Sequence, residues 1–128
     1  MNRVEFKHSY IRTALWSTND ESDPSGGVPM DDNYGIDDID PATLNKLFAD
    51  CDKFCDLMEG LHKFIGDGFD PCNNPNTAGH DFWLTQNGHG AGFWDGDWPE
   101  DVGTRLTEAS KTFPEVNLYV GDDGKIYA

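Results

Sequence analysis

The longest regular pattern of apolar residues in this 128-residue chain lies between residues 40 and 66. Asp40 and Pro41 form a helix start, because the carboxylate caps free N–H groups and proline suits the first helical position. Apolar residues then recur at spacings of three and four, as one face of a helix requires, up to Gly66: Leu44, Leu47, Phe48, Cys51, Phe54, Cys55, Met58, Leu61 and Ile65. This pattern predicts a helix over residues 41–65 with a mainly acidic outer face.

Shorter apolar runs on either side of this helix predict strands. Residues 10–18 are rich in β-branched and aromatic types and end in the turn-forming pair Asn19-Asp20, so we predict a strand there. Residues 82–85 and 92–95 are two aromatic runs on either side of Asn87-Gly88, the preferred dipeptide of a tight turn. These two runs predict a β-hairpin.

A second helix and a second hairpin complete the predicted fold. Asp97-Trp98-Pro99 repeats the acid-and-proline helix start, and an apolar stripe follows at Val102, Leu106, Ala109 and Phe113. Residues 116–120 and 125–127 flank a turn and predict the second hairpin, whereas residues 66–79 are predicted to be a connector. We therefore predict a single acidic α+β domain over residues 1–128, with an antiparallel sheet of about four or five strands and two helices packed on one face.

Composition and charge exclude several classes of function. The chain has 24 acidic and 9 basic residues, a net charge of −15, so direct binding to nucleic-acid phosphates is not expected. It has neither an apolar run long enough to span a membrane nor the apolar core of a signal peptide, which predicts a protein that stays in the cytoplasm. The three cysteines are predicted to be reduced thiols and not a disulfide framework.

The acidic residues concentrate in one part of the chain. Residues 19–40 carry eight acidic and no basic side chains and lack apolar periodicity, which predicts a long acidic loop that contributes little to stability but much to binding. Such a field attracts a basic partner, although acidity also serves solubility alone. The predicted partner-binding residues are carboxylates of this loop and of the following helix: Asp31, Asp32, Asp37, Asp38, Asp52, Asp56 and Glu59.

A cluster of histidines and aspartates in residues 79–95 suggests a different chemistry. Imidazole and carboxylate are common ligands of zinc and iron, and His80, His89 and Asp95 would form a metal site if the hairpin curled. With Asp81, such a site would make the chain a metal-dependent hydrolase. The alternative, which we favour, is that the glycines serve the turn and the polar groups bond the backbone, with no metal or other cofactor.

Other catalytic and metal motifs fit poorly. Residues 95–101 and 122–124 are loose acidic runs that lack the spacing of a calcium loop, so we predict a helix cap and a hairpin turn instead. Cys51 and Cys55 lie on the predicted apolar stripe, a setting that does not activate a thiol. The sequence therefore contains no nucleophile motif that we would assign to catalysis.

Four stretches of the chain form long and specific motifs: ALWSTNDES at 14–22, NYGIDDIDP at 33–41, AGHDFWLTQNGHGAGFWD at 78–95 and LYVGDDGKIY at 118–127. With these motifs the chain resembles a family of small acidic proteins carried by bacteriophages. The resemblance covers most of residues 13–127 and implies the cytoplasm of a host bacterium and a role against host defence or in the takeover of a host protein. No functional residues carry over from this family, and Gln86 departs from the basic residue expected in relatives.

The charge and the resemblance together predict a phage accessory protein that binds, and thereby inhibits, a host protein with a basic or nucleic-acid-binding surface. Imitation of DNA charge against a restriction, CRISPR or other DNA-binding machine is one form that this inhibition would take. The alternative is the metal-dependent hydrolase that uses His80, Asp81, His89 and Asp95.

Overall fold

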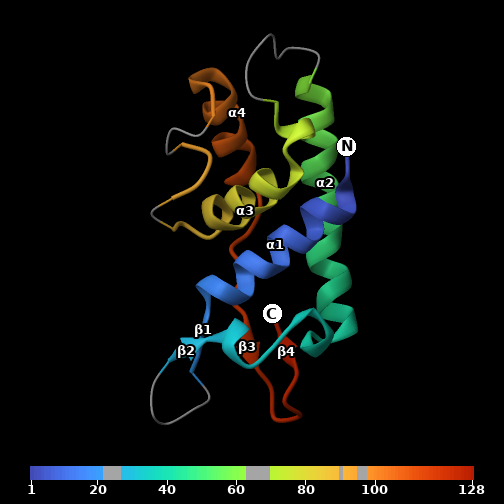
Figure 1. The fold of residues 1–128 in the computed structure, drawn as a ribbon, viewed down its shortest axis with the longest axis vertical. Helices are drawn as coiled ribbons and strands as arrows, with labels where there is room; N and C mark the ends of the chain where they lie inside the picture. Colours follow the sequence, from blue (N-terminus) through green and yellow to red (C-terminus); the bar gives the residue numbers. More distant parts are fainter. Residues whose placement is uncertain (22–26, 63–69, 90, 95–97) are drawn as a thin grey trace.

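The fold is mainly helical, as the computed structural model of residues 1–21, 27–62, 70–89, 91–94 and 98–128 shows (Figure 1). The described strands form two separate two-stranded pairs. The predicted antiparallel sheet of four or five strands with two helices on one face is therefore wrong. The α-helices are α1 (Arg3–Ser17), α2 (Pro41–His62), α3 (Pro75–Gln86) and α4 (Glu100–Ser110).

The predicted long helix is confirmed as α2, which follows the long axis of the molecule (Figure 1). Asp40 caps its start, because a carboxylate oxygen of Asp40 accepts a hydrogen bond from the backbone N–H of Thr43 at 3.1 Å. The apolar stripe faces inward, and the predicted end at Ile65 and Gly66 lies outside the described residues. The fully or nearly fully buried members of the stripe are Leu47, Cys51, Phe54, Cys55 and Met58.

Residues 10–18 belong largely to α1, so the predicted strand at this position is wrong. Phe6, Tyr10 and Ala14 are each 0% exposed and lie four residues apart, which is a helical period. The buried face also holds Ser9 and Thr13, whose hydroxyl groups donate hydrogen bonds to backbone carbonyls. Ser9 Oγ donates to Asn76 O at 2.5 Å, and Thr13 Oγ1 donates to Ser9 O at 2.9 Å. Small hydroxyl residues therefore permit close helix packing without unsatisfied polar atoms.

The predicted hairpin at 82–95 is also wrong, since residues 82–85 belong to α3. Asn87 and Gly88 do form a tight turn, but one that ends a helix. Gly88 has φ +70°, and the side-chain amide of Asn87 donates to Trp83 O at 3.0 Å. Asn-Gly suits a helix end for the same reason that it suits a hairpin, because glycine adopts positive φ without strain. The second strand of this hairpin was predicted at residues 92–95, of which Asp95 lies outside the described residues.

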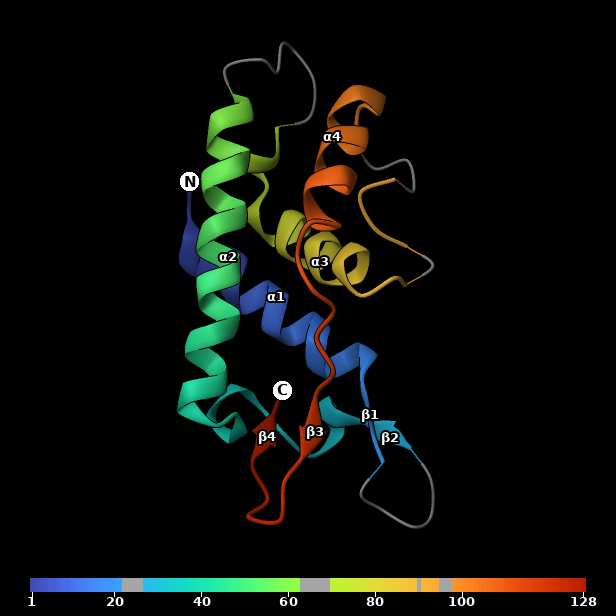
Figure 2. The same cartoon turned by 180° about the vertical axis from the view of Figure 1, so that it is seen from behind.

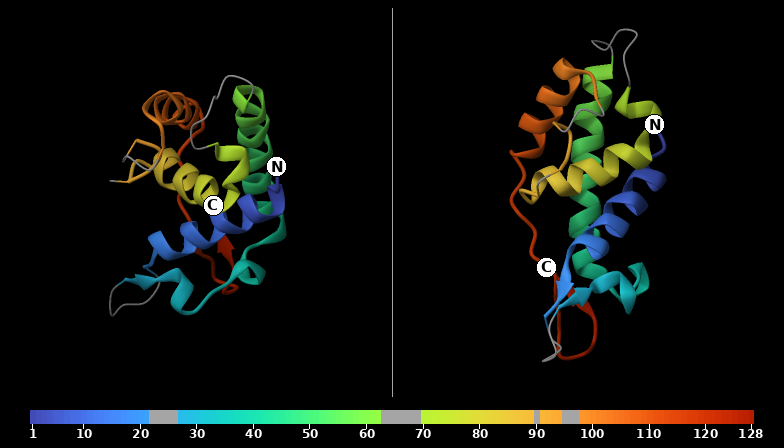
Figure 3. Two further views of the ribbon diagram at one scale, coloured as in Figure 1. Left: turned by 45° about the horizontal axis from the view of Figure 1, so that its top comes forward. Right: turned by 60° about the vertical axis from the view of Figure 1, so that its left-hand side comes forward.

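Helices α1 and α3 lie side by side and run in the same direction, and α1 crosses α2 (Figures 1 and 3). Their close approach depends on Gly79, which sits against the backbone of Phe6. Aromatic rings fill the space between the three helices: the rings of Phe54 and Phe82 stack with centroids 4.1 Å apart, and Tyr10 meets Trp83 edge-on at 5.3 Å. The core is therefore an aromatic layer between helices, not the face of a sheet.

Polar groups inside this layer are paired. The hydroxyl of Tyr10 donates to Gln86 Oε1 at 2.6 Å, and the Gln86 amide donates to Pro114 O at 3.0 Å. The indole N–H of Trp83 donates to Ser17 Oγ at 2.7 Å. Burial raises the pKa of the Tyr10 hydroxyl well above its usual value, so this group stays a neutral donor. Gln86, where the phage family led us to expect a basic residue, thus links α1 to the chain after α4.

The predicted second helix and second hairpin are confirmed as α4 and as the pair β3 (Tyr119–Val120) and β4 (Ile126–Tyr127). The turn between the strands has Gly124 at φ +78°, and a carboxylate oxygen of Asp123 accepts from the backbone N–H of Lys125 at 3.0 Å. The short pair β1 (Asn19–Asp20) and β2 (Val28–Pro29) lies at the same end of the molecule (Figure 2).

The predicted acidic loop of residues 19–40 is more ordered than its composition suggests. Its described part contains the 3₁₀ turns η1 (Met30–Asp32) and η2 (Ile36–Asp38). Met30 and Ile39 lie in the core at 1% and 3% exposure, and Ile39 forms a bridge with Ile126 of β4. Residues 31–38 of the loop are thus anchored on both sides, by Met30 and by Ile39. The expectation that the loop contributes little to stability does not fit these contacts.

Candidate functional site

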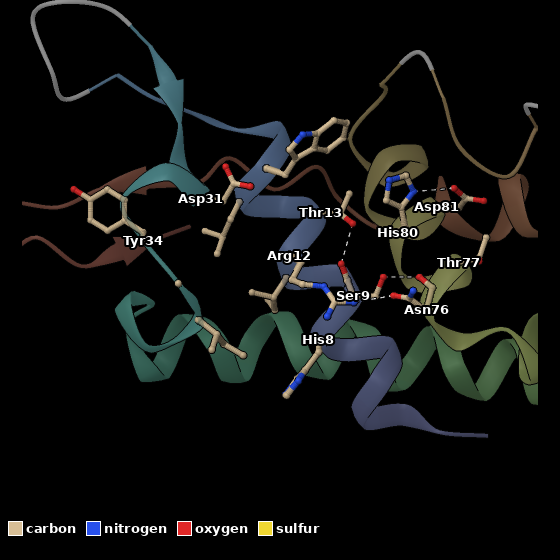
Figure 4. Close-up of a pocket in the computed structure, with 15 residues that line it drawn as sticks. His8, Ser9, Arg12, Thr13, Asp31, Tyr34, Asn76, Thr77, His80 and Asp81 are labelled. Carbon is tan, nitrogen blue, oxygen red and sulfur yellow. Dashed lines mark hydrogen bonds and ion pairs between the residues drawn. The ribbon is translucent and has the colours of Figure 1, made fainter.

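A groove of about 830 Å³ lies between α1, the segment of residues 31–36 and α3 (Figure 4). Its walls combine aromatic, basic and acidic side chains with the apolar surface of α1. A concave site that mixes apolar surface with a few polar groups is typical of binding sites. The side chains that set its chemistry are His8, Arg12, Trp16, Asp31, Tyr34 and His80.

Trp16 is the exposed aromatic residue of this groove. It is 55% exposed, and its ring stacks on the imidazole of His80 with centroids 6.1 Å apart and planes at 29°. His80 Nδ1 in turn lies 3.2 Å from a carboxylate oxygen of Asp81, which is 2% exposed. Tryptophan is enriched among the residues that dominate binding energy, and a ring already held in place loses little freedom on binding. Trp16 is therefore a suitable anchor for a partner.

The floor of the groove is polar and joins α1 to α3. Arg12 Nη2 donates to the side-chain oxygen of Asn76 at 2.8 Å, next to the hydrogen bond from Ser9 to the Asn76 carbonyl. These contacts hold the Arg12 guanidinium at the edge of the groove (Figure 4). The groove thus offers one cation on the side opposite Asp31.

The other wall of the groove continues into an acidic segment, residues 31–38. Asp31 and Asp32 lie on η1, Asp37 and Asp38 on η2, and the Asp38 carboxylate also accepts the Gly35 backbone N–H at 2.8 Å. Within the described part of the chain, none of these four carboxylates forms an ion pair. Their charge is therefore uncompensated and available to a partner.

The predicted binding carboxylates of α2 are placed differently, since two cations of α1 already form ion pairs with them and offset most of their charge. Arg3 contacts Asp52, Asp56 and Glu59 at 3.3, 2.7 and 3.0 Å. Lys7 adds a contact to Asp52 at 3.1 Å, and this hydrogen bond, with that of Arg3, lowers the pKa of Asp52. These three acids hold α1 on α2 and offer a partner less charge than the acidic segment does.

The His and Asp cluster suggested as a hydrolase site does not come together in the described residues. His80 and Asp81 are adjacent on α3, but Asp81 also accepts the indole N–H of Trp98 at 2.6 Å. His89 follows the C-terminal end of α3 and lines a different hollow, together with Glu115. Asp95 lies outside the described residues. No converging set of three metal-ligand atoms forms from His80, Asp81 and His89 in the part of the chain described.

The cysteines are free thiols, and two of them lie buried where the α2 stripe predicted them. Burial raises the pKa of Cys51 well above its usual value and that of Cys55 to about 12. Neither thiol is held as a thiolate, so the buried pair is part of the packing.

Sequence reasoning missed Trp16 and the basic residues Arg3 and Lys7. With residues 10–18 taken as a strand, Trp16 counted as part of a sheet and not as an exposed ring. The helical spacing of Arg3 and Lys7, four residues apart, could have placed both on one side of α1. Nothing in the sequence indicated which acids they would meet, because those acids lie about 50 residues later in the chain.

Comparison with protein-family models, with curated proteins and with solved structures finds no match to this chain. None of the described helices combines the length and the hydropathy that crossing a lipid bilayer requires. The groove and the charges around it are therefore the features that indicate a function.

Proposed function

We propose that this chain is a non-catalytic binding protein that docks on a basic surface of another protein through Trp16 and the acidic segment. The observation that carries the proposal is the contrast between the two acidic regions. Arg3 and Lys7 form ion pairs with Asp52, Asp56 and Glu59 of α2, whereas the carboxylates of the acidic segment have no such cations among the described residues. Uncompensated charge next to an exposed aromatic ring favours association with a basic partner.

The surroundings of the acidic segment support this role. Met30 and Ile39 are buried on either side of it, so the four carboxylates are held on short 3₁₀ turns and not on a free chain. A surface that is ordered before binding loses less conformational entropy when the partner arrives. The net charge of −15 adds long-range attraction, which raises the rate of encounter with a cationic surface.

The resemblance to small acidic phage proteins supports a host bacterial protein as this partner. A surface that normally binds nucleic acid fits best, because carboxylates then take the place of phosphates on cationic side chains. Occupation of such a surface would inhibit the host protein by competition with DNA or RNA. This extends the proposal from binding to inhibition of a host defence or regulatory protein in the host cytoplasm.

The test compares two variants with the same change of net charge. In the first, all four carboxylates of the acidic segment become amides (Asp31, Asp32, Asp37 and Asp38 to Asn). In the matched control, four exposed acids elsewhere are neutralised (Glu21, Glu108 and Glu115 to Gln, Asp122 to Asn). Binding to a deca-arginine peptide is measured by calorimetry at low and high salt. Capture of host proteins on each immobilised variant follows, with DNA as competitor.

Loss of four contacts worth roughly 0.5 kcal/mol each lowers affinity about 30-fold at low salt. We expect this loss in the first variant, little change in the control, and a tenfold or greater loss in Trp16→Ala. A captured host protein should be released by DNA and should not bind the first variant. Equal peptide affinity and equal capture by the two charge variants would refute the proposed surface.

A further inference from the structure

Three potential metal ligands of different kinds converge at the end of α2 that is remote from the acidic segment. The imidazole of His62, the carboxylate of Asp70 and the thiol of Cys72 each offer one ligand atom, and these atoms all lie within 4.8 Å of one another. His62 is the last residue of α2, Asp70 is the N-cap of the 3₁₀ turn η3 (Pro71–Asn73), and Cys72 lies in that turn. This convergence does not involve the residues of the proposed binding surface.

Asp70 is positioned by its own backbone neighbourhood. One carboxylate oxygen accepts the N–H of Cys72 at 2.9 Å, and the Asn74 side chain donates to the Asp70 carbonyl at 2.8 Å. The other carboxylate oxygen lies 2.5 Å from His62 Nδ1, and the Asp70 side chain is only 12% exposed. A nearly buried carboxylate with one oxygen bonded to the backbone presents the second in a fixed direction, as ligands with ordered surroundings do.

We propose that His62, Asp70 and Cys72 form a binding site for a divalent transition-metal ion, with zinc as the natural occupant. Imidazole, thiolate and carboxylate are the three protein ligands of zinc, whereas a thiolate is unsuited to Mg²⁺ and Ca²⁺. In a tetrahedral site, ligand atoms stand about 3.3–3.6 Å apart. The three atoms lie within 4.8 Å of one another, and the 2.5 Å between His62 Nδ1 and the Asp70 carboxylate is shorter than this spacing, so the exposed imidazole has to move away from Asp70 to admit the ion.

Charge favours a cation at this place. With the thiol proton released to solvent, Cys72 and Asp70 supply two negative charges to the ion, and Glu59 lies one helical turn before His62. The carbonyl end of α2 adds a partial negative charge at His62. Glu59 is held by Arg3 at 3.0 Å, so it acts on the ion through its charge and not as a ligand.

A small hollow adjoins two of the three proposed ligands, His62 and Cys72. This hollow has a volume of about 210 Å³ and is lined by Met1, Glu59, His62, Cys72 and Asn73. Three protein ligands with an open fourth position leave room for water or for a ligand atom from another molecule. The ion would also connect the end of α2 to η3 across the intervening stretch of chain, so metal binding stabilises the fold.

Co²⁺ titration of the reduced, metal-free full chain tests this site, because cobalt occupies zinc sites and reports on thiolate ligands. We expect one Co²⁺ per chain, a near-ultraviolet thiolate-to-cobalt band, intense visible bands of tetrahedral cobalt, and displacement by Zn²⁺. The expected result includes a higher melting temperature with Zn²⁺ than with chelator.

Two variants and one control assign the ligands. Cys72→Ser should abolish the near-ultraviolet band, and the buried Cys51 and Cys55 remain as internal controls for other thiols. His62→Gln should weaken Co²⁺ affinity at least tenfold, whereas His8→Gln, an exposed histidine away from the site, should leave affinity unchanged.

The proposal is overturned by any of three results. These are no stoichiometric Co²⁺ binding by the unaltered chain, a thiolate band that survives in Cys72→Ser, and unchanged affinity in His62→Gln. If circular dichroism shows that Cys72→Ser does not fold, His62→Gln decides alone, because the His62 side chain is 57% exposed and its replacement leaves the core intact. The peptide-binding test of the acidic segment is independent of all these outcomes.

Discussion

Replacement of Gly79 by alanine should destabilise the protein, although alanine is the better helix former. A Cβ atom at position 79 of α3 would lie closer than 3.0 Å to the backbone carbonyl oxygen of Phe6 and 3.1 Å from the Ser9 Cβ atom. The Phe6 oxygen belongs to the backbone of α1 and cannot turn aside. The whole of α1 would have to move, and its movement would loosen the contacts of the buried Phe6 ring with Phe54 and Phe82.

The magnitude follows from two opposing effects. A methyl group forced into a packed interface costs about 2–3 kcal/mol, and the better helix propensity of alanine returns about 0.5–1 kcal/mol. We therefore expect Gly79→Ala to lower the free energy of unfolding by about 1–2.5 kcal/mol. Gly60→Ala is the matched control, because Gly60 is an exposed residue of α2 and an added Cβ there meets no heavy atom within 4 Å. That variant should gain about 0.5–1 kcal/mol from propensity alone.

Urea unfolding measures both variants, with far-ultraviolet circular dichroism for the helices and tryptophan fluorescence, to which the buried Trp83 and Trp98 contribute, for the core. A chelator in all samples removes any contribution of bound metal. The two alanine variants should shift the unfolding midpoint in opposite directions. If Gly79→Ala were as stable as the unaltered protein, or more stable, the close packing of α1 against α3 would be wrong.

Three further predictions address single contacts. Trp98→Phe removes the 2.6 Å hydrogen bond to the buried Asp81 and should cost about 1–3 kcal/mol in the same urea assay. Arg3→Gln should be less stable than the unaltered chain at neutral pH. Hydrogen bonds from Lys7 and, to a smaller extent, from Arg3 lower the pKa of Asp52 in the folded state. The part of this stabilisation that Arg3 provides is complete above pH 3.8 and is lost as the pH falls through the lower folded pKa, so the thermal midpoints of the two chains should converge in acid. Cys72, which is partly exposed, should be the first thiol to react with a thiol-specific disulfide reagent, with the two core thiols reacting only after unfolding and Zn²⁺ slowing the first reaction.

Elements with one apolar face were predictable from the sequence, and elements buried on several sides were not. The apolar residues of α2 repeat every three to four residues from Leu44 to Leu61, and the opposite face of the helix is acidic. The helical period can therefore be recognised in the sequence. In α3, by contrast, residues 81–86 are all buried. A short run without a polar face reads equally as a strand or as a helix, and the aromatic content then favours the wrong choice.

The candidate site was only partly predictable for a related reason. The acidic residues were visible in the composition, but their pairing depends on tertiary contacts with Arg3 and Lys7 that no local pattern encodes. Similarly, Asn87-Gly88 indicates positive φ without saying whether a strand or a helix precedes it. The converging His62, Asp70 and Cys72 match no spacing that is known to bind metal, so only the folded chain brings them to attention.

The packing of α1 against α3 also sets the order in which this protein can fold. Tyr10 and its partner Gln86 are 76 residues apart, which corresponds to about 4–15 s of ribosomal synthesis. Throughout that interval the aromatic face of α1 has no α3 to cover it, so the nascent chain is a substrate for chaperones and prone to aggregation. The α-helices themselves form within about a microsecond, and we therefore expect the folding rate to depend on the late docking of α3 onto α1 and α2, as in proteins of higher contact order.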